Sequence, residues 1–288
     1  MAELLKGMPV AKALTEKTGA KAAELKERGI IPTLAIVRVG ENPSDVSYEK
    51  GALKRAGKTG VEVKRILLPE DISQEDLIAE IVRINEDDSV HGVLLFRPLP
   101  SHIDEKAVCE TLAPEKDMDG ITSGSMAGVF MDEDRGYPPC TAAACMAILD
   151  HYGIELKGRK VTVMGRSLVI GKPVAMMAMR KHATVTVCHS RTRPEDFAEA
   201  GRNADIVIAA LGRTRMVGPD KLGENQVILD VGINVDEEGN LCGDVDFDGA
   251  EPSAAAITPV PGGVGSVTTA ILMKHLVEAA AAAEKSKN

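Results

Sequence analysis

The segment Val161–Val174, VTVMGRSLVIGKPV, carries the pattern on which the fold prediction rests. Its first four residues are apolar or β-branched and predict a buried strand. Gly165 ends that strand, and a short turn leads through Gly171 to Pro173, which we expect at the first helical position. Backbone N–H groups and the helix dipole both favour an anion at such a helix start. The Gly-x5-Gly spacing differs from GxGxxG, so an ordinary strand–turn–helix explains the segment equally well.

Strands and helices alternate along the rest of the chain. Strands are predicted at 33–39, 61–67, 90–96, 161–164, 184–188, 205–209, 226–231 and 256–258. Helices are predicted at 3–28 (cut or kinked by Pro9), 47–58, 73–87 (capped by Ser73 and Asp76), 105–112, 141–153, 173–181, 194–200 and 268–285. This alternation predicts an α/β fold with parallel sheets covered by helices. Ligands bind such sheets at the carboxyl ends of the strands.

Composition narrows the class of protein. A chain of 288 residues is long enough for two domains, and its net charge of −9 argues against nucleic acid or an anionic membrane as the main partner. Trp is absent, so aromatic base stacking is not expected. The five cysteines form no CxxC and have no histidine at ligand spacing, which favours reduced thiols, no metal site and a cytoplasmic protein. We expect neither a signal peptide nor a membrane-spanning segment.

The residues that follow the strand at 184–188 indicate which dinucleotide the protein binds. NAD sites place a carboxylate at this strand end, whereas NADP sites place a cation that accepts the 2′-phosphate. Here the residues are His189-Ser190-Arg191-Thr192-Arg193, and Arg166 lies in the first turn. Arginine pairs well with a phosphate dianion, so the sequence favours NADP, although simply solvated arginines are the alternative. We interpret His189 as a structural hydrogen-bonding residue.

Eight segments make the chain similar to a known enzyme family. They are KDMDG (116–120), PPCT (138–141), VMGRSLVIGKP (163–173), ATVTVCHSRT (183–192), ADIVIAALG (204–212), VILDVGIN (227–234), GDVDF (243–247) and TPVPGGVG (258–265). In this order they resemble the methylenetetrahydrofolate dehydrogenase/methenyltetrahydrofolate cyclohydrolase family.

The resemblance implies an architecture and a cofactor site. A folate-binding α/β domain would comprise residues 1–140 and 267–288, and a Rossmann-type NADP domain residues 141–266, with the active site in the cleft between them. The family implies a homodimer formed through the NADP domain. The expected cofactor-binding residues are Gly165, Arg166, Ser167, Gly171, Ser190, Arg191 and Ile233.

The resemblance also implies the folate contacts. Tyr48 would stack beside the substrate, and Asp119 would accept hydrogen bonds from its pterin. The glycine-rich loop Pro261-Gly262-Gly263 would bring backbone close to substrate. The alternative for Asp119 is a carboxylate that caps its own loop.

The chain differs from the family at the position where the general base is expected. Bifunctional members have Tyr-x-x-x-Lys, and Ala52 stands where the lysine belongs, one helical turn from Tyr48. Lys50 and Lys54 point about 200° and 240° around the helix from Tyr48. The glutamine that partners the lysine in the family is Phe96 here, followed by Arg97.

Further departures are Thr122, Ala142–Ala144 and Ser266, where the family has His, a PxG segment and Pro. Hydride removal from the methylene carbon needs positioning rather than a protein base, whereas hydrolysis of the methenyl product needs proton transfer. We therefore predict an NADP-dependent methylenetetrahydrofolate dehydrogenase with weak or absent cyclohydrolase activity. The alternatives are a relocated base at Lys54 or Arg97, a non-catalytic NADP- or folate-binding protein, and a dehydrogenase for an unrelated substrate.

Overall fold

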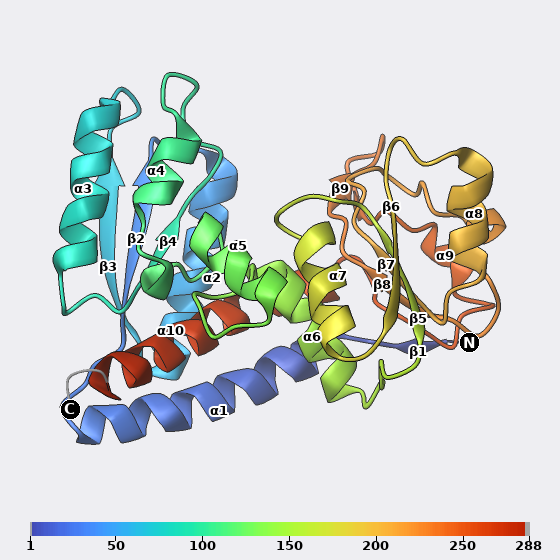
Figure 1. The fold of residues 1–288 in the computed structure, drawn as a ribbon, viewed down its shortest axis with the longest axis horizontal. Helices are drawn as coiled ribbons and strands as arrows, with labels where there is room; N and C mark the ends of the chain where they lie inside the picture. The colour runs from blue at the N-terminus through green and yellow to red at the C-terminus, as the bar shows by residue number, and fades with distance from the viewer. Residues whose placement is uncertain (1, 286–288) are drawn as a thin grey trace. The chain divides into compact units, whose positions relative to one another are not determined.

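The computed structural model describes residues 2–285, which divide into two compact units (Figure 1). The three-strand unit comprises residues 12–140 and 269–285, and the six-strand unit comprises residues 2–11 and 141–268. The predicted domains, 1–140 with 267–288 and 141–266, differ from these units in where the first eleven residues belong. The first residues pack with the six-strand unit, because a short N-terminal strand pairs with its sheet. None of the described helices is long and apolar enough to cross a membrane.

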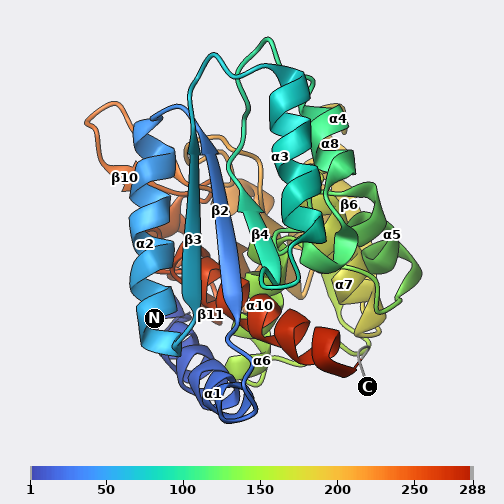
Figure 2. The ribbon, with the colours of Figure 1, turned by 90° about the vertical axis from the view of Figure 1, so that its left-hand side faces the viewer.

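The three-strand unit is built on a parallel sheet in the order β3-β2-β4, seen in Figure 2. Its strands are β2 (Thr33–Val39), β3 (Glu62–Leu68) and β4 (Gly92–Leu95). The intervening helices are α2 (Pro43–Thr59) and α3 (Gln74–Glu86), and α4 (Glu105–Thr111) follows β4. β2 and β4 are almost wholly buried, which explains their continuous apolar sequences.

Two helices of this unit differ from the prediction. α2 starts at Pro43, four residues earlier than predicted, because the Asn42 side chain accepts the Ser44 N–H and Pro43 suits a first helical position. A helix was missed after the KDMDG segment: α5 (Ser123–Met131) is capped by Thr122, whose hydroxyl accepts the Ser125 N–H. The N-cap predicted at Ser73 is confirmed, since its hydroxyl accepts the Asp76 N–H at 3.1 Å, whereas the Asp76 carboxylate accepts the Ser73 hydroxyl instead of the Ser73 N–H of a capping box.

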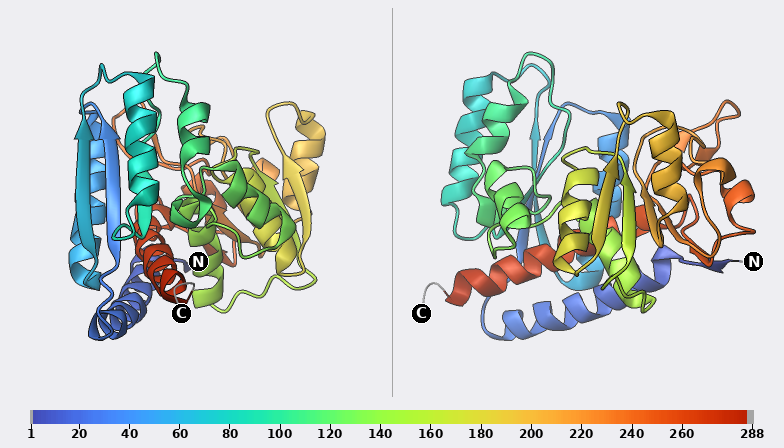
Figure 3. Two further views of the ribbon diagram at one scale, coloured as in Figure 1. Left: turned by 60° about the vertical axis from the view of Figure 1, so that its left-hand side comes forward. Right: turned by 45° about the vertical axis from the view of Figure 1, so that its right-hand side comes forward.

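The long helices α1 (Gly7–Glu27) and α10 (Thr268–Lys285) lie side by side in both views of Figure 3. Arg28, just beyond α1, pairs with Glu284 near the end of α10. The predicted helix 3–28 was wrong at its start. Glu3–Leu4 form strand β1, and Pro9 lies in the first turn of α1, where a proline is tolerated.

A buried ion network fixes α2 against the sheet. Glu49 of α2 is 2% exposed and accepts the Arg38 Nε–H of β2 at 3.0 Å. Arg65 of β3 pairs with the other oxygen of Glu49 at 2.5 Å. Arg38 also donates to the Gly40 carbonyl, so its buried guanidinium has a second partner. The helix that follows β2 is thereby held to β2 and β3.

The six-strand unit has a parallel sheet in the order β1-β11-β8-β7-β5-β6. Its strands after β1 are β5 (Lys160–Met164), β6 (Thr184–Cys188), β7 (Ile206–Ala209), β8 (Val227–Asp230) and β11 (Ala256–Ile257). Its helices are α6 (Cys140–His151), α7 (Gly171–Arg180), α8 (Pro194–Arg202) and the short α9 (Phe247–Ala250). A two-stranded antiparallel pair, β9 (Asn234–Val235) and β10 (Leu241–Cys242), extends from the loop after β8.

Single-turn 3₁₀ segments complete the fold at η1 (Pro114–Lys116), η2 (Pro219–Lys221) and η3 (Val264–Ser266). The predicted start of α7 was two residues late. The helix begins at Gly171, and Pro173 lies inside its first turn rather than at its first position.

The ion network generates a stability prediction. Glu49→Ala leaves two arginines without their shared partner, one of them buried, and should cost about 3–5 kcal/mol of unfolding free energy. Urea unfolding followed by circular dichroism measures this loss. The control is Glu16→Ala, which removes an exposed i,i+4 pair with Lys12 and should change stability by less than about 0.5 kcal/mol. Equal effects of the two substitutions would contradict a stabilising role for the network.

Candidate functional site

The strand register of the six-strand unit brings four loops to one sheet edge. Met164 is the Cα partner of both Cys188 and Ala209, and Ala209 is the partner of Asp230. β5, β6, β7 and β8 therefore end level with one another. Chain order reverses at β5, with β6 on one side and β7 on the other, and a crevice at such a switch point is where ligands bind in open α/β sheets.

The turn after β5 is packed too closely for any residue but glycine at two positions. Gly165 has φ +137°, and a Cβ there would lie 2.2 Å from the Ala210 carbonyl oxygen. A Cβ on Gly171 would lie 2.3 Å from the Gly165 carbonyl oxygen. The start of α7 thus packs directly on the end of β5. Gly165 and Gly171 are therefore required at these positions for a steric reason.

Ser167 organises the donors of this turn. Its hydroxyl oxygen accepts the N–H groups of Ile170 at 3.1 Å and Gly171 at 3.4 Å, which caps the helix start. The hydroxyl proton is left to donate outward. Within residues 2–285, the N–H groups of Ser167, Leu168 and Val169 have no hydrogen-bond acceptor. An exposed row of backbone donors at a helix start fits a phosphate.

The neighbouring strand end holds the predicted 2′-phosphate residues. The Gly165 N–H donates to the Cys188 carbonyl, which joins the two strand ends. His189 Nδ1 accepts the Arg191 backbone N–H at 3.1 Å, and the backbone N–H of His189 donates to the Thr192 hydroxyl at 2.9 Å. His189 therefore shapes the loop, as its interpretation as a structural residue requires. Ser190 and Arg191 are both exposed at this loop.

The two arginines of this loop are not equivalent. Arg193 donates to both carboxylate oxygens of Asp196, at 2.7 and 2.9 Å, which raises the pKa of its guanidinium. The structure shows no carboxylate within ion-pair distance of Arg191 or Arg166 among residues 2–285. Of the three arginines, the two nearest the strand ends are therefore the ones open to an anionic ligand.

Two buried aspartates that the sequence reasoning missed hold the adjoining loops. Asp244 accepts N–H groups from Leu211, Gly212 and Arg213 in the loop after β7, and an amide N–H from Asn234. Four donors converge on one wholly buried carboxylate. The loop that follows β7 is thereby tied to the segment after β10.

Asp230, at the end of β8, anchors the backbone of the turn that follows this strand. Its carboxylate accepts the N–H groups of Gly232, Asp244 and Val245. Burial nevertheless raises the pKa of Asp230 from 3.8 to about 7, because desolvation outweighs these hydrogen bonds. Since the pKa is raised in the folded state, ionisation of Asp230 opposes folding, and its contribution to stability falls as pH rises from about 4 through 7.

The glycines near these aspartates could have indicated the anchoring role from the sequence. A Cβ on Gly232 would lie 2.3 Å from the Asp244 carboxylate, and one on Gly243 would lie 1.7 Å from Asp230. Gly243 in GDVDF and Gly232 in VILDVGIN are thus both positions where the backbone closes on a carboxylate. The sequence prediction used GDVDF only as part of the family resemblance and gave its residues no role.

The loop after β11 carries the predicted substrate contacts Pro261, Gly262 and Gly263. Gly262 has φ +105° and its carbonyl accepts the Gly7 N–H at 2.8 Å, so the loop rests on the start of α1. Ile233 is exposed and reaches toward Gly265 of the same loop, where an added Cβ would lie 3.1 Å from its side chain. The predicted cofactor residue Ile233 and the glycine loop therefore lie side by side in this unit.

The remaining predicted folate residues belong to the three-strand unit. Tyr48 lies on α2, and its ring meets the ring of Phe96 in a T-shaped contact, with centroids 5.9 Å apart and planes at 83°. Ala52, one turn further along α2, is fully buried, whereas Lys50 and Lys54 are exposed. The structure thus places the two lysines away from the face that Tyr48 and Ala52 share.

Arg97 is occupied by a carboxylate of α4. Its guanidinium lies 3.4 Å from Glu105 Oε1, and the second Glu105 oxygen accepts the Leu99 N–H at 2.9 Å. The Arg97–Pro98 peptide bond between them is cis. The guanidinium has no acceptor atom, so Arg97 is poorly suited to act as a general base.

The two aspartates of KDMDG have different surroundings. Asp117 is buried and accepts the N–H groups of Ile121 and Thr122 and the Ser125 hydroxyl, so it holds the start of α5. Asp119 is only partly buried and accepts one N–H, from Cys140 at 3.0 Å. Desolvation raises the pKa of Asp119 above 3.8. Asp119 thus also holds backbone, at the start of α6, which is consistent with the capping alternative stated for it.

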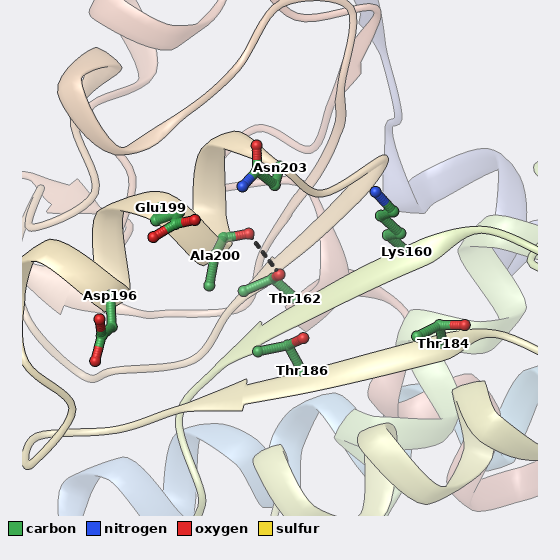
Figure 4. Close-up of a pocket in the computed structure, with 8 residues that line it drawn as sticks. All are labelled: Lys160, Thr162, Thr184, Thr186, Asp196, Glu199, Ala200 and Asn203. Atoms are coloured by element: carbon green, nitrogen blue, oxygen red, sulfur yellow. Dashed lines mark hydrogen bonds between the residues drawn. The ribbon is translucent and has the colours of Figure 1, made fainter.

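A separate polar cavity of about 380 Å³ lies on the sheet face between β5, β6 and α8 (Figure 4). Lys160, Thr162, Thr184 and Thr186 line it from the strands, and Asp196, Glu199, Ala200 and Asn203 from α8 and its end. It contains none of the predicted cofactor residues. No group of three or more His, Cys, Asp or Glu able to hold a metal ion occurs in residues 2–285, and all five cysteines are buried and unpaired.

Comparison with known proteins covers both units. A family model described as tetrahydrofolate dehydrogenase/cyclohydrolase, catalytic domain, matches residues 5–119, and one described as its NAD(P)-binding domain matches residues 139–284. The bifunctional protein FolD of Alkaliphilus metalliredigens (strain QYMF) is 48% identical over 97% of this chain and 98% of that relative. The protein of the same name from Clostridioides difficile (strain 630) is 48% identical over 96% of each chain.

Solved structures agree with these matches. The bifunctional enzyme FolD from Campylobacter jejuni superposes with a TM-score of 0.94 at 36% identity, covering 98% of this chain and 99% of that one. The Trypanosoma brucei N5,N10-methylenetetrahydrofolate dehydrogenase-cyclohydrolase, solved with NADP cofactor and an inhibitor, gives 0.91 at 34% identity, covering 100% and 99%.

The six-strand unit, with its glycine turn and open donors at the sheet edge, is an NAD(P)-binding domain of an enzyme. Together with the matched catalytic domain, it shows that the chain belongs to the tetrahydrofolate dehydrogenase/cyclohydrolase family.

Asp244 provides a test of the loop anchoring. In Asp244→Asn, the amide NH₂ must face backbone N–H donors, so the substitution should cost about 1–3 kcal/mol of unfolding free energy, measured by urea denaturation. The exposed Asp248 provides the control, because Asp248→Asn should stay within about 0.5 kcal/mol of wild type. A wild-type midpoint for Asp244→Asn would contradict the anchoring role.

Proposed function

We propose that this protein oxidises 5,10-methylenetetrahydrofolate to 5,10-methenyltetrahydrofolate, with NADP⁺ as hydride acceptor, and hydrolyses the product slowly or not at all. The dehydrogenase part rests on the family, the complete glycine turn and the open arginines beside it. The restriction on hydrolysis rests on one observation. The position one helical turn from Tyr48 is a fully buried alanine, Ala52, and the nearby lysines are exposed.

The oxidation requires little proton chemistry from the protein. The two nitrogens that flank the methylene carbon stabilise the cation that develops as the hydride leaves, and bound NADP⁺ supplies the hydride acceptor. The protein must hold the reacting carbon in place, because orientation alone can supply much of the rate. Tyr48, as a stacking ring, and the Pro261–Gly263 loop, as close backbone, are the groups proposed for this task.

Asp119 is proposed to bind the pterin. A carboxylate accepts the paired N–H donors of a 2-amino-pyrimidinone edge, and the single N–H bond from Cys140 leaves Asp119 with accepting capacity. This role requires the ionised form. Because desolvation raises the pKa of Asp119, folate affinity should weaken on acidification at a higher pH than for an ordinary aspartate.

Hydrolysis of the methenyl product makes a different demand. Water must attack and lose a proton, and a positioned base typically contributes about 10²–10⁴-fold. Alanine at position 52 offers none. The relatives named bifunctional give the alternative, a protein with a base elsewhere. The exposure of Lys54 and the pairing of Arg97 with Glu105 both count against that alternative.

The proposed NADP site makes a prediction about two arginines. Arg191→Gln should raise the KM for NADP⁺ about 10-fold and that for NAD⁺ little, because it removes a charged hydrogen bond to the 2′-phosphate. Arg193→Gln is the matched control, since Asp196 already holds that guanidinium. Steady-state NADPH formation measures both. Equal KM effects in the two variants, or none in either, would assign the phosphate to other residues.

The reaction is tested by following NADPH and methenyltetrahydrofolate together in one spectrophotometric assay. NADPH should form with methylenetetrahydrofolate, and methenyltetrahydrofolate should then decay no faster with enzyme than in buffer. Saturable enzymatic decay would overturn the restriction on hydrolysis. Absence of NADPH formation, despite binding of folate and NADP⁺, would indicate a non-catalytic binding protein, and absence of folate binding would indicate another substrate.

Restoring the lysine provides a further prediction. Ala52→Lys should not restore full hydrolysis, because Phe96 offers no partner for the new ammonium and the position is fully buried. A buried, unpaired ammonium should also lower the stability of the fold or lose its proton. The methenyl decay assay checks the activity, and Ala52→Met, which is of similar length but uncharged, separates crowding from charge. Hydrolysis at a family-like rate in Ala52→Lys would contradict this reasoning.

A homodimer in the cytoplasm completes the proposal. It rests on the family resemblance, and sedimentation equilibrium of the purified protein tests the oligomeric state.

A further inference from the structure

Phe96 occupies a fixed position beyond the end of β4. Its N–H donates to the Val37 carbonyl of β2 at 3.0 Å, which extends the strand ladder by one residue, and its side chain is 8% exposed. The ring has little freedom to move, because backbone and side chain are both held. Phe96 is therefore a rigid surface within the three-strand unit.

The rigid ring meets Tyr48. The centroid distance of 5.9 Å and interplanar angle of 83° match the T-shaped geometry that aromatic pairs prefer. Aromatic packing is unusual in this chain, which has four Phe and three Tyr in 288 residues. Of the ring contacts in residues 2–285, this is the one between a Phe and a Tyr.

The backbone that carries Tyr48 is fixed independently. The next residue, Glu49, points about 100° further around α2 and is locked between Arg38 and Arg65. The ion pairs set the rotation of the helix, but they do not set the side-chain torsions of Tyr48. The contact with Phe96 restricts those torsions.

We propose that Phe96 is a positioning residue that holds the Tyr48 ring in its stacking orientation before folate binds. The inference rests on the proposed function. The family places a lysine and a glutamine beside the tyrosine. In this chain, an aromatic contact between Phe96 and Tyr48 takes the place of that polar pair. A preset ring loses less conformational entropy on binding than a free one, so the contact should contribute to folate affinity.

The test is a double-mutant cycle of Phe96→Leu and Tyr48→Leu. The dissociation constant of tetrahydrofolate is measured by calorimetry, and the KM and kcat by NADPH formation. Phe96→Leu should raise the dissociation constant and the folate KM by about 2- to 12-fold, the range expected from one aromatic pair. The KM for NADP⁺ should not change, Phe96→Tyr should restore affinity, and Phe96→Leu should have no further effect in the Tyr48→Leu background.

Phe197→Leu is the control for loss of a buried phenylalanine, since Phe197 is 6% exposed in the six-strand unit. It should lower thermal stability as Phe96→Leu does, without changing tetrahydrofolate affinity. Equal loss of affinity from Phe96→Leu with and without Tyr48, or no loss at all, would overturn the positioning role while wild type still binds folate. Failure of the wild-type protein to bind tetrahydrofolate would overturn the proposed function and this inference together.

Discussion

The loops at the sheet edges depend on one constraint, which is that buried backbone N–H groups need acceptors. Three buried aspartates supply them. Asp117 holds the start of α5, Asp230 holds the backbone at Gly232, Asp244 and Val245, and Asp244 holds the loop after β7. A carboxylate can accept several such bonds at once, so one side chain fixes several residues of irregular backbone. Of the predicted ligand residues, Asp119 and Ile233 are the ones next to these anchored segments.

The two units satisfy this constraint in different ways. In the six-strand unit, the donors of the glycine turn at residues 167–169 are left open, and close glycine packing brings α7 onto β5. An open row of donors suits a phosphate. In the three-strand unit, Glu49 anchors α2 and Asp117 anchors the KDMDG loop, and the proposed folate residues Tyr48 and Asp119 lie on these anchored segments. In the proposed function, the first arrangement would bind an anion through backbone, and the second a flat heterocycle through side chains.

The substitutions near Tyr48 form a consistent set. Ala52 is buried, Phe96 packs on Tyr48, Arg97 pairs with Glu105, and Thr122 caps α5. These four departures from the family pattern are thus accommodated by a specific contact or by burial. This set supports the proposal of a protein that keeps the oxidation, in which geometry matters most, and has little hydrolysis, which needs a base.

The sequence by itself determined the α/β class, most strands to within two residues and the carboxyl-edge location of Gly165, Ser190 and Arg191, because hydrophobic periodicity and glycine punctuation are local signals. It did not determine that Glu3–Leu4 form a strand, that α5 exists, or that Asp230 and Asp244 anchor neighbouring loops. β1 depends on pairing with β11, more than 250 residues away, and the aspartates act on donors from other loops. The pairing of Arg193 with Asp196, three residues further along the chain, is a local contact that the sequence spacing allows. Only the tertiary structure decided that Phe96 meets Tyr48, since one residue follows β4 and the other lies on α2, and local sequence does not encode contacts between separate elements.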